Sequence, residues 1–158
     1  MESRVKVLGH GTHPILVALP IGLLSSALGF DLLHLITGDK KWSQIAFWNM
    51  IAGCVSGWVS MIPGAIDWWF LPWGTRAKRV ATIHAVIADT SINLFFASWL
   101  LRRKDPDNPP AKAIALAGLG GAVLMAVGWF GGELVQRLGV SVSPGANLDA
   151  PNSLLSGE

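Results

Sequence analysis

Four ionisable side chains that can bind metals or carry protons lie at corresponding ends of four apolar segments. His13 opens the first segment in "GHGTHPILVALPIG", and His84 lies one or two turns inside the third. Asp67 in "PGAIDWW" and Glu133 in "GWFGGELV" close the second and the fourth. Neutral imidazole binds transition metals and haem iron, while carboxylates bind metals or orient a ligating histidine. These residue types predict a metal or haem site wherever the fold brings them together.

The apolar segments that must position these groups are long enough to cross a membrane. Of the 158 residues, 51% are hydrophobic and 14% are charged, against roughly 25% charged in a soluble domain. A helix needs roughly 20 apolar residues to cross about 30 Å of hydrocarbon, and lipid requires the backbone to satisfy its own hydrogen bonds. We therefore predict an all-α fold, an integral membrane antiparallel four-helix bundle in the lipid bilayer.

The expected domain boundaries follow from the same pattern. The lead 1–12 is polar, the four-helix domain occupies 13–138, and the tail 139–158 is polar and expected to be flexible. The membrane spans are expected at about 14–36, 44–69, 79–102 and 112–136. Pro20 is expected to bend the first helix one to two turns past His13, because a proline inside a helix removes a hydrogen bond.

Short charged connections make neighbouring helices run in opposite directions, so the four chemical groups lie on one side of the membrane, here called side A. The first and third helices are diagonal in an up-down bundle, so His13 and His84 can clamp a flat macrocycle. Asp67 and Glu133 would then hold the outer ring nitrogens or move protons. The alternative is that these groups are hydrated, cap helices, or pair with Arg76 or Arg79. His10 precedes the helix and can simply lie among lipid headgroups.

Other polar residues form weaker candidates. Asp31 lies five helical turns after His13, on the same face, and shares a side with His34 near the opposite membrane surface, side B. Asp31 and His34 are a helix-end pair, a second site, or a point of proton entry. Asp89 is mid-span in "HAVIADTSINLF", about 140° around the helix from His84. Asn93 follows one turn later and can hydrogen-bond to it.

Three roles remain open for Asp89: a protonated side chain, a partner across an oligomer interface, or part of a proton path.

Lysines and arginines gather at the helix ends, which is typical of interfacial anchoring and does not indicate nucleic-acid binding. Six lie on each side, so their distribution does not decide the orientation.

Stripes of small residues favour close contact between helices. They comprise Gly53, Gly57, Ser60 and Gly64 in the second span, and Gly118, Gly121, Gly128 and Gly132 in the fourth.

Several segments together resemble a known family. They are "HPILVALPIGLLSSALGFDLL", "AFWNMIAGCVSGWVSMIPGAIDW", a histidine opening the third span, and "GWFGGELVQRLGVSV". The chain is similar, over roughly 9–142, to a bacterial group of predicted four-helix membrane proteins with domain of unknown function 2231. In the third span the family tends to carry an asparagine closer behind the histidine than Asn93 is here. The positions that match its motifs are His13, Pro14, Pro20, Gly22, Asp31, Gly64, Asp67, His84, Gly132 and Glu133.

The resemblance implies a bacterial inner (cytoplasmic) membrane protein. Some relatives look as if they are joined to Rieske iron–sulfur or cytochrome c-like domains, which implies respiratory electron transfer. The sequence contains no "C-x-x-C-H", so covalent c-type haem is excluded and haem b remains.

We therefore expect an electron-transfer subunit that holds haem b between His13 and His84 and exchanges electrons with quinone or a Rieske- or cytochrome-type partner. The first alternative is a module without redox chemistry that binds or transports a metal or another ion and holds Zn, Fe or Cu. The second is a structural subunit, in an oligomer or a larger membrane complex. No nucleophile elbow, phosphate loop or HExxH motif occurs, so the sequence indicates no conventional enzyme and leaves catalysis open.

Overall fold

Four long helices pack together in the computed structural model, which describes residues 1–154. Two short strands, β1 (Lys6–Val7) and β2 (His10–Gly11), precede helix α1 (Thr12–Leu16). The long helices are α2 (Ala18–Thr37), α3 (Lys40–Phe70), α4 (Arg76–Arg102) and α5 (Ala111–Gly132), and α5 continues into a π-helical turn, η1 (Glu133–Arg137). Four segments are long and apolar enough to cross a membrane: Thr12–Thr37, Lys40–Phe70, Arg76–Arg102 and Ala111–Arg137. The predicted all-α membrane bundle is confirmed.

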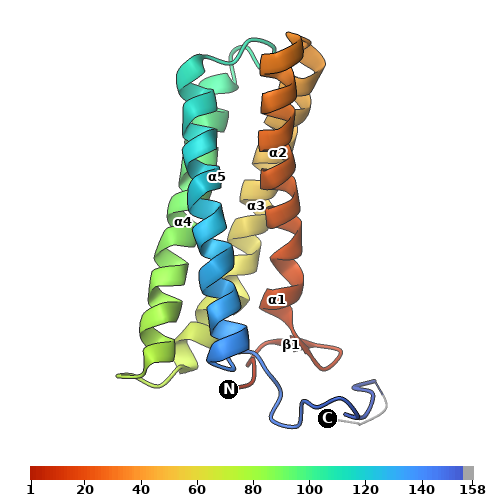
Figure 1. Ribbon diagram of the computed structural model, residues 1–158, viewed down its shortest axis with the longest axis vertical. Coiled ribbons are helices and arrows are strands. Elements are labelled where there is room, and N and C mark those ends of the chain that lie inside the picture. The colour runs from red at the N-terminus through yellow and green to blue at the C-terminus, as the bar shows by residue number, and fades with distance from the viewer. Residues whose placement is uncertain (155–158) are drawn as a thin grey trace.

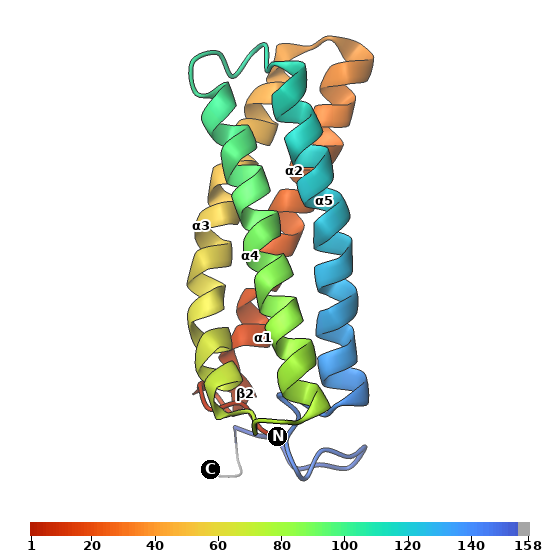
Figure 2. The same ribbon diagram turned by 90° about the vertical axis from the view of Figure 1, so that its left-hand side faces the viewer.

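The helices form a ring in the order α2, α3, α4, α5 (Figures 1 and 2). The connections from α2 to α3 and from α4 to α5 lie at one end, which corresponds to side B. The connection from α3 to α4 lies at the other end, with the lead and the tail, and corresponds to side A. Helices α2 and α4 are therefore diagonal to each other, as are α3 and α5.

Side chains in the connections set where two of the helices begin. Asp39 caps α3, because its carboxylate accepts a hydrogen bond from the backbone N–H of Lys41 at 3.0 Å. Thr75 caps α4 in the same way through the backbone N–H of Lys78 at 3.1 Å. Helix α3 consequently starts at Lys40, four residues before the expected start of the span.

Pro20 interrupts the first membrane segment, as expected. The segment divides at Val17 into α1 and α2, next to Leu16, whose carbonyl lies four residues before the proline. A proline cannot donate to that carbonyl and its ring pushes against it. Pro20 itself is buried. Because the segment is interrupted, the direction of α1, which carries His13, is not fixed by the direction of α2.

The lead and the start of the tail are packed against side A. Strands β1 and β2 form an antiparallel hairpin with Val7 opposite His10. Its two-residue turn has positive φ at Leu8 (49°) and Gly9 (78°), which is typical of the tightest hairpins. Beyond η1, Val140 is buried in a cluster with Leu71, Val80, Ala81 and Leu134. The tail expected to begin at 139 therefore starts with packed residues.

The main hydrophobic core lies in the middle of the bundle. Its buried residues are Leu24, Ala27, Ala46, Met50, Cys54, Ile92, Phe95 and Ala117. The predicted small-residue contacts are formed on α3, where a Cβ at Gly53 would lie 2.6 Å from Leu24 and one at Gly57 would lie 2.8 Å from Ile92. On α5, Gly121 contacts Leu28, but Gly118, Gly128 and Gly132 have open space beside them, so the predicted stripe on that helix is only partly an interface.

Candidate functional site

His13 and His84 meet on side A, across the diagonal of the bundle. Their ring centroids lie 6.5 Å apart, with ring planes at 87° to each other. Both side chains are partly buried. The expectation that these two histidines converge from the first and third membrane segments is met by this geometry.

The local sequence of α3 explains how His13 is held. Its Nδ1 donates a hydrogen bond to the backbone carbonyl of Ser60 at 2.7 Å, because a carbonyl oxygen can only accept. Pro63 lies inside α3 at this level, where it cannot donate a helical hydrogen bond to the Val59 carbonyl. Gly64 leaves the space that the imidazole occupies, since a Cβ there would lie 2.9 Å from the Cε1 and Nδ1 atoms of His13.

His84 is held in a similar way by α5. Its Nδ1 donates to the backbone carbonyl of Val127 at 3.2 Å. A Cβ on Gly131 would lie 3.3 Å from Cε1 of His84, so this glycine also gives the ring its space. Each histidine therefore sits against the backbone of the next helix in the ring beside a glycine.

These hydrogen bonds fix which ring nitrogen is available to a ligand. A neutral imidazole that donates from Nδ1 keeps a lone pair on Nε2. Histidines that bind metals in proteins almost always donate their other N–H to a carbonyl, a carboxylate or water. With metal–nitrogen bonds of about 2.0–2.1 Å, two imidazoles on opposite sides of one ion have centroids roughly 6 Å apart. The separation of His13 and His84 is close to that value.

Asp67 does not join the histidines. Its carboxylate accepts a hydrogen bond from the Ser3 hydroxyl at 2.7 Å and another from the Arg4 backbone N–H at 2.6 Å. The side chain is 5% exposed. Asp67 therefore fastens the lead to the end of α3, and among residues 1–154 it does not form a metal-binding group with the two rings.

Glu133 is also engaged elsewhere. It begins the π-helical turn η1 and forms an ion pair of 2.5 Å with Arg76 at the start of α4. This is the arginine pairing that the sequence offered as the alternative. No group of three or more His, Cys, Asp or Glu side chains that could hold a metal occurs within residues 1–154. Of the four expected groups, the structure brings together only the two histidines.

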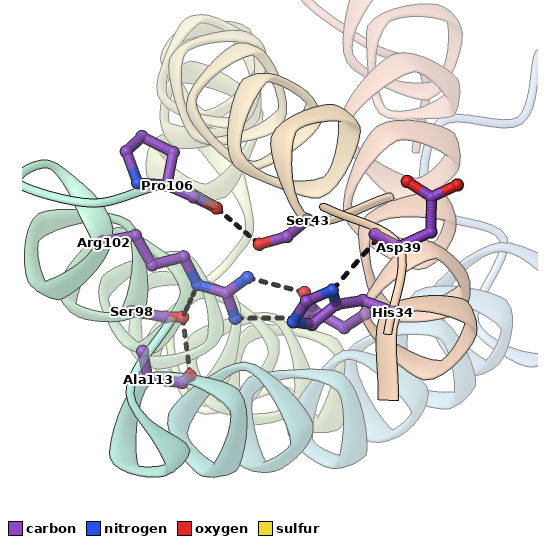
Figure 3. A network of polar contacts seen from close by, with 8 residues as sticks. His34, Asp39, Ser43, Ser98, Arg102, Pro106 and Ala113 are labelled. Carbon is purple, nitrogen blue, oxygen red and sulfur yellow. Dashed lines mark hydrogen bonds and ion pairs between the residues drawn. The ribbon is translucent and has the colours of Figure 1, made fainter. Parts of the chain in front are cut away.

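The second candidate cluster, on side B, is an ion pair that the sequence did not predict. Arg102 of α4 donates from Nη1 and Nη2 to the two carboxylate oxygens of Asp31 of α2, at 2.6 and 2.7 Å. Figure 3 shows the surrounding network, in which the Nε of Arg102 also donates to the Ser98 hydroxyl at 3.2 Å. Each carboxylate oxygen of Asp31 therefore has a partner on Arg102, and the helix-end pair of Asp31 with His34, one of the alternatives that the sequence left open, is not formed.

His34 and His10 both lie apart from the central site. The Nδ1 of His34 donates to the Asp39 carbonyl at 3.2 Å, and the Nδ1 of His10 donates to the Leu8 carbonyl at 2.9 Å. Both contacts are exposed. These residues stabilise turns at the two ends of the first membrane segment.

Asp89 and Asn93 lie on the outer surface of α4, away from the histidines. Both are exposed, and the Asn93 side-chain amide donates to the backbone carbonyl of Asp89 at 2.9 Å. This exposed position agrees with the 140° that separates Asp89 from His84 around the helix. A carboxylate at the bilayer centre costs roughly 2.5–3.5 kcal/mol on insertion scales, so its outward position requires an explanation.

The fold and the apolar helices define a four-helix membrane protein. The chain matches the family model described as predicted membrane protein (DUF2231) over residues 9–144. The chain belongs to this family, which carries no assigned function. No curated protein and no solved structure is matched by this chain.

Proposed function

We propose that this protein is a membrane electron-transfer subunit that binds b-type haem between His13 and His84. The observation that carries the proposal is the pair of imidazoles from diagonal helices, 6.5 Å apart and each held at Nδ1 by a backbone carbonyl. This arrangement leaves two Nε2 lone pairs for one ligand.

The number of donors favours haem over a bare metal ion. Zinc sites in proteins usually have three or four protein ligands, and the described residues offer no such group around the two rings. Haem brings its own four nitrogen ligands and needs only axial ligands from the protein. Two histidines are therefore the donor set that haem requires. Zn, Fe or Cu remains the alternative for the same pair.

The residues of the chain would orient and tune such a group. The Ser60 and Val127 carbonyls fix the ring orientations and raise the basicity of Nε2 by accepting from Nδ1–H. Gly64 and Gly131 keep the flanking helices free of side chains at the level of the rings. Bound haem would supply a one-electron couple. The position near side A would suit exchange with quinone or with a Rieske- or cytochrome-type partner at the surface of a bacterial inner membrane.

Absorption spectra of the detergent-purified protein, oxidised and then reduced with dithionite, test this proposal. We expect a Soret band and a sharp reduced α-band, both lost in His13→Ala and His84→Ala. His34→Ala is the matched control, since that ring lies on side B and makes its hydrogen bond at the exposed Asp39 carbonyl, and it should keep the spectrum. Circular dichroism checks that each variant remains folded.

The proposal fails if protein from haem-replete cells has a featureless spectrum, or if His84→Ala keeps its haem. Stoichiometric metal without a Soret band, lost in the same two variants, would establish the metal-binding alternative instead.

A further inference from the structure

Asp89 lies on a surface of α4 where a monomer in lipid leaves its carboxylate without a hydrogen-bonding partner. It stands 13 residues from each end of α4, which runs from Arg76 to Arg102, and is thus about 20 Å from either end. The residue is exposed, and its carboxylate has no hydrogen-bonding or ionic partner among residues 1–154. Lipid tails offer no hydrogen bonds at this depth.

The residues next to Asp89 on this face are suited to a helix contact. Asn93 follows one turn later, is also exposed, and uses one amide N–H for the Asp89 backbone carbonyl. An amide has a second N–H and an acceptor oxygen, and both remain available on the outer face. Val86, 60% exposed, precedes Asp89 by one turn. Ala85 is exposed and Ala97 partly so, and small side chains let another helix approach closely.

We propose that this stripe, Ala85, Val86, Asp89, Asn93 and Ala97, is the dimer interface between two copies of this chain in the membrane. In a dimer whose two copies insert with the same orientation, the α4 helices lie parallel and place equal residues at equal depth. A two-fold axis along the membrane normal then repeats every contact. Asp89 of each copy receives the free amide N–H of Asn93 of the other, so the donor and the acceptor satisfy each other twice.

A second copy is favoured over an unrelated partner because the stripe is self-complementary. A different protein would have to carry its own donor at the bilayer centre, whereas this chain already carries one a single turn from the acceptor. The inference needs no haem and is independent of the proposed function.

Disulfide cross-linking in native membranes tests the interface. Val86→Cys is oxidised with copper-phenanthroline, and Met125→Cys on the outer face of α5, 74% exposed, is the matched control. The natural Cys54 is buried, and the unmodified chain shows its background. We expect a cross-linked dimer from Val86→Cys and at least tenfold less from Met125→Cys.

Adding Asp89→Leu to Val86→Cys should reduce the dimer at least tenfold, although it makes α4 more apolar and easier to insert. Adding Asp89→Asn, which keeps a hydrogen-bonding side chain, should retain it. Equal cross-linking at the two cysteine positions, a cross-link that survives Asp89→Leu, or a monomer in membranes would each overturn the proposal. Cross-linking of Val86→Cys to a different protein would overturn the assignment of the second copy.

Discussion

Arg102 and Asp31 form a two-pronged ion pair across the bundle diagonal, on side B, at the end opposite the histidine pair. The guanidinium is 0% exposed and the carboxylate side chain 4% exposed. Like His13 and His84, the two residues join the first and third membrane segments, which are not neighbours in the ring. The bundle is therefore connected across its diagonal at both ends, by the ion pair on side B and by the two imidazole rings on side A.

Arg102→Ala should destabilise the fold strongly. The change leaves the Asp31 carboxylate buried without its partner, and breaking a buried pair in this way costs about 3–5 kcal/mol. The double variant Asp31→Leu with Arg102→Met should recover most of the loss, because it removes both charges. Unfolding in mixed detergent and SDS micelles measures the difference. Arg103→Ala is the control, since that residue is exposed and its guanidinium lies over the Trp99 ring at 5.3 Å. An equal loss in both single variants would contradict the prediction.

Gly64→Ala should displace the His13 ring. The new methyl would lie 2.9 Å from Cε1 and Nδ1, and such overpacking typically costs about 1–3 kcal/mol. We expect the ring to lose its bond to the Ser60 carbonyl and the protein to bind haem more weakly. Titration of the purified apoprotein with haem measures the affinity. Gly118→Ala, which has open space beside it, should keep the affinity, and a matching loss there would show that the effect is general.

The membrane spans could be predicted because a backbone in lipid must satisfy its own hydrogen bonds. An uninterrupted apolar stretch of spanning length must be a helix, so the four helices follow from composition alone. The short connections also made His13 and His84 converge, since they decide which helices are diagonal. Neither inference required knowledge of how a helix is rotated about its axis.

The partners of the charged groups could not be predicted, because they depend on how each helix is rotated about its axis and on how the ends of the chain fold. The pattern "LLRRK" indicates that Arg102 is one of several interfacial charges. Only the rotation of α4 about its axis directs its side chain inward to Asp31. Asp67 binds Ser3 because the lead folds back over side A, which a short polar segment does not reveal. Glu133 points to Arg76 because α5 ends in a π-helical turn, which shifts the side chain relative to a regular helix.

Asp67→Ala should release the lead from side A. The change removes the acceptor for both the Ser3 hydroxyl and the Arg4 N–H, and leaving buried donors unpaired costs about 1–3 kcal/mol. Hydrogen exchange should become faster for the amides of residues 3–11, while α3 and α4 stay protected. Asp107→Ala is the control, because that carboxylate accepts an exposed hydrogen bond from Gln44 on side B. Unchanged exchange in the lead would show that Asp67 does not fasten it.

The Asp39 cap should give a pH dependence outside the membrane segments. The Lys41 ammonium, 2.9 Å away, and then the Lys41 backbone N–H lower the pKa of Asp39 below its ordinary value of 3.8. The charged form is thus favoured in the folded state. Its contribution to stability is fully present above pH 3.8, declines as the pH falls, and is lost below the lowered pKa.

Lys41→Ala should therefore raise the pKa of Asp39 toward 3.8 without restoring it fully, because the backbone N–H at 3.0 Å remains. Carbon NMR of the aspartate carboxyl group, followed through an acid titration, measures the shift directly. Lys40→Ala is the matched control, since it removes the same charge one residue earlier and leaves the contact between Asp39 and Lys41 in place. A rise of equal size in both variants would mean that general charge around the connection, and not this contact, holds the pKa down.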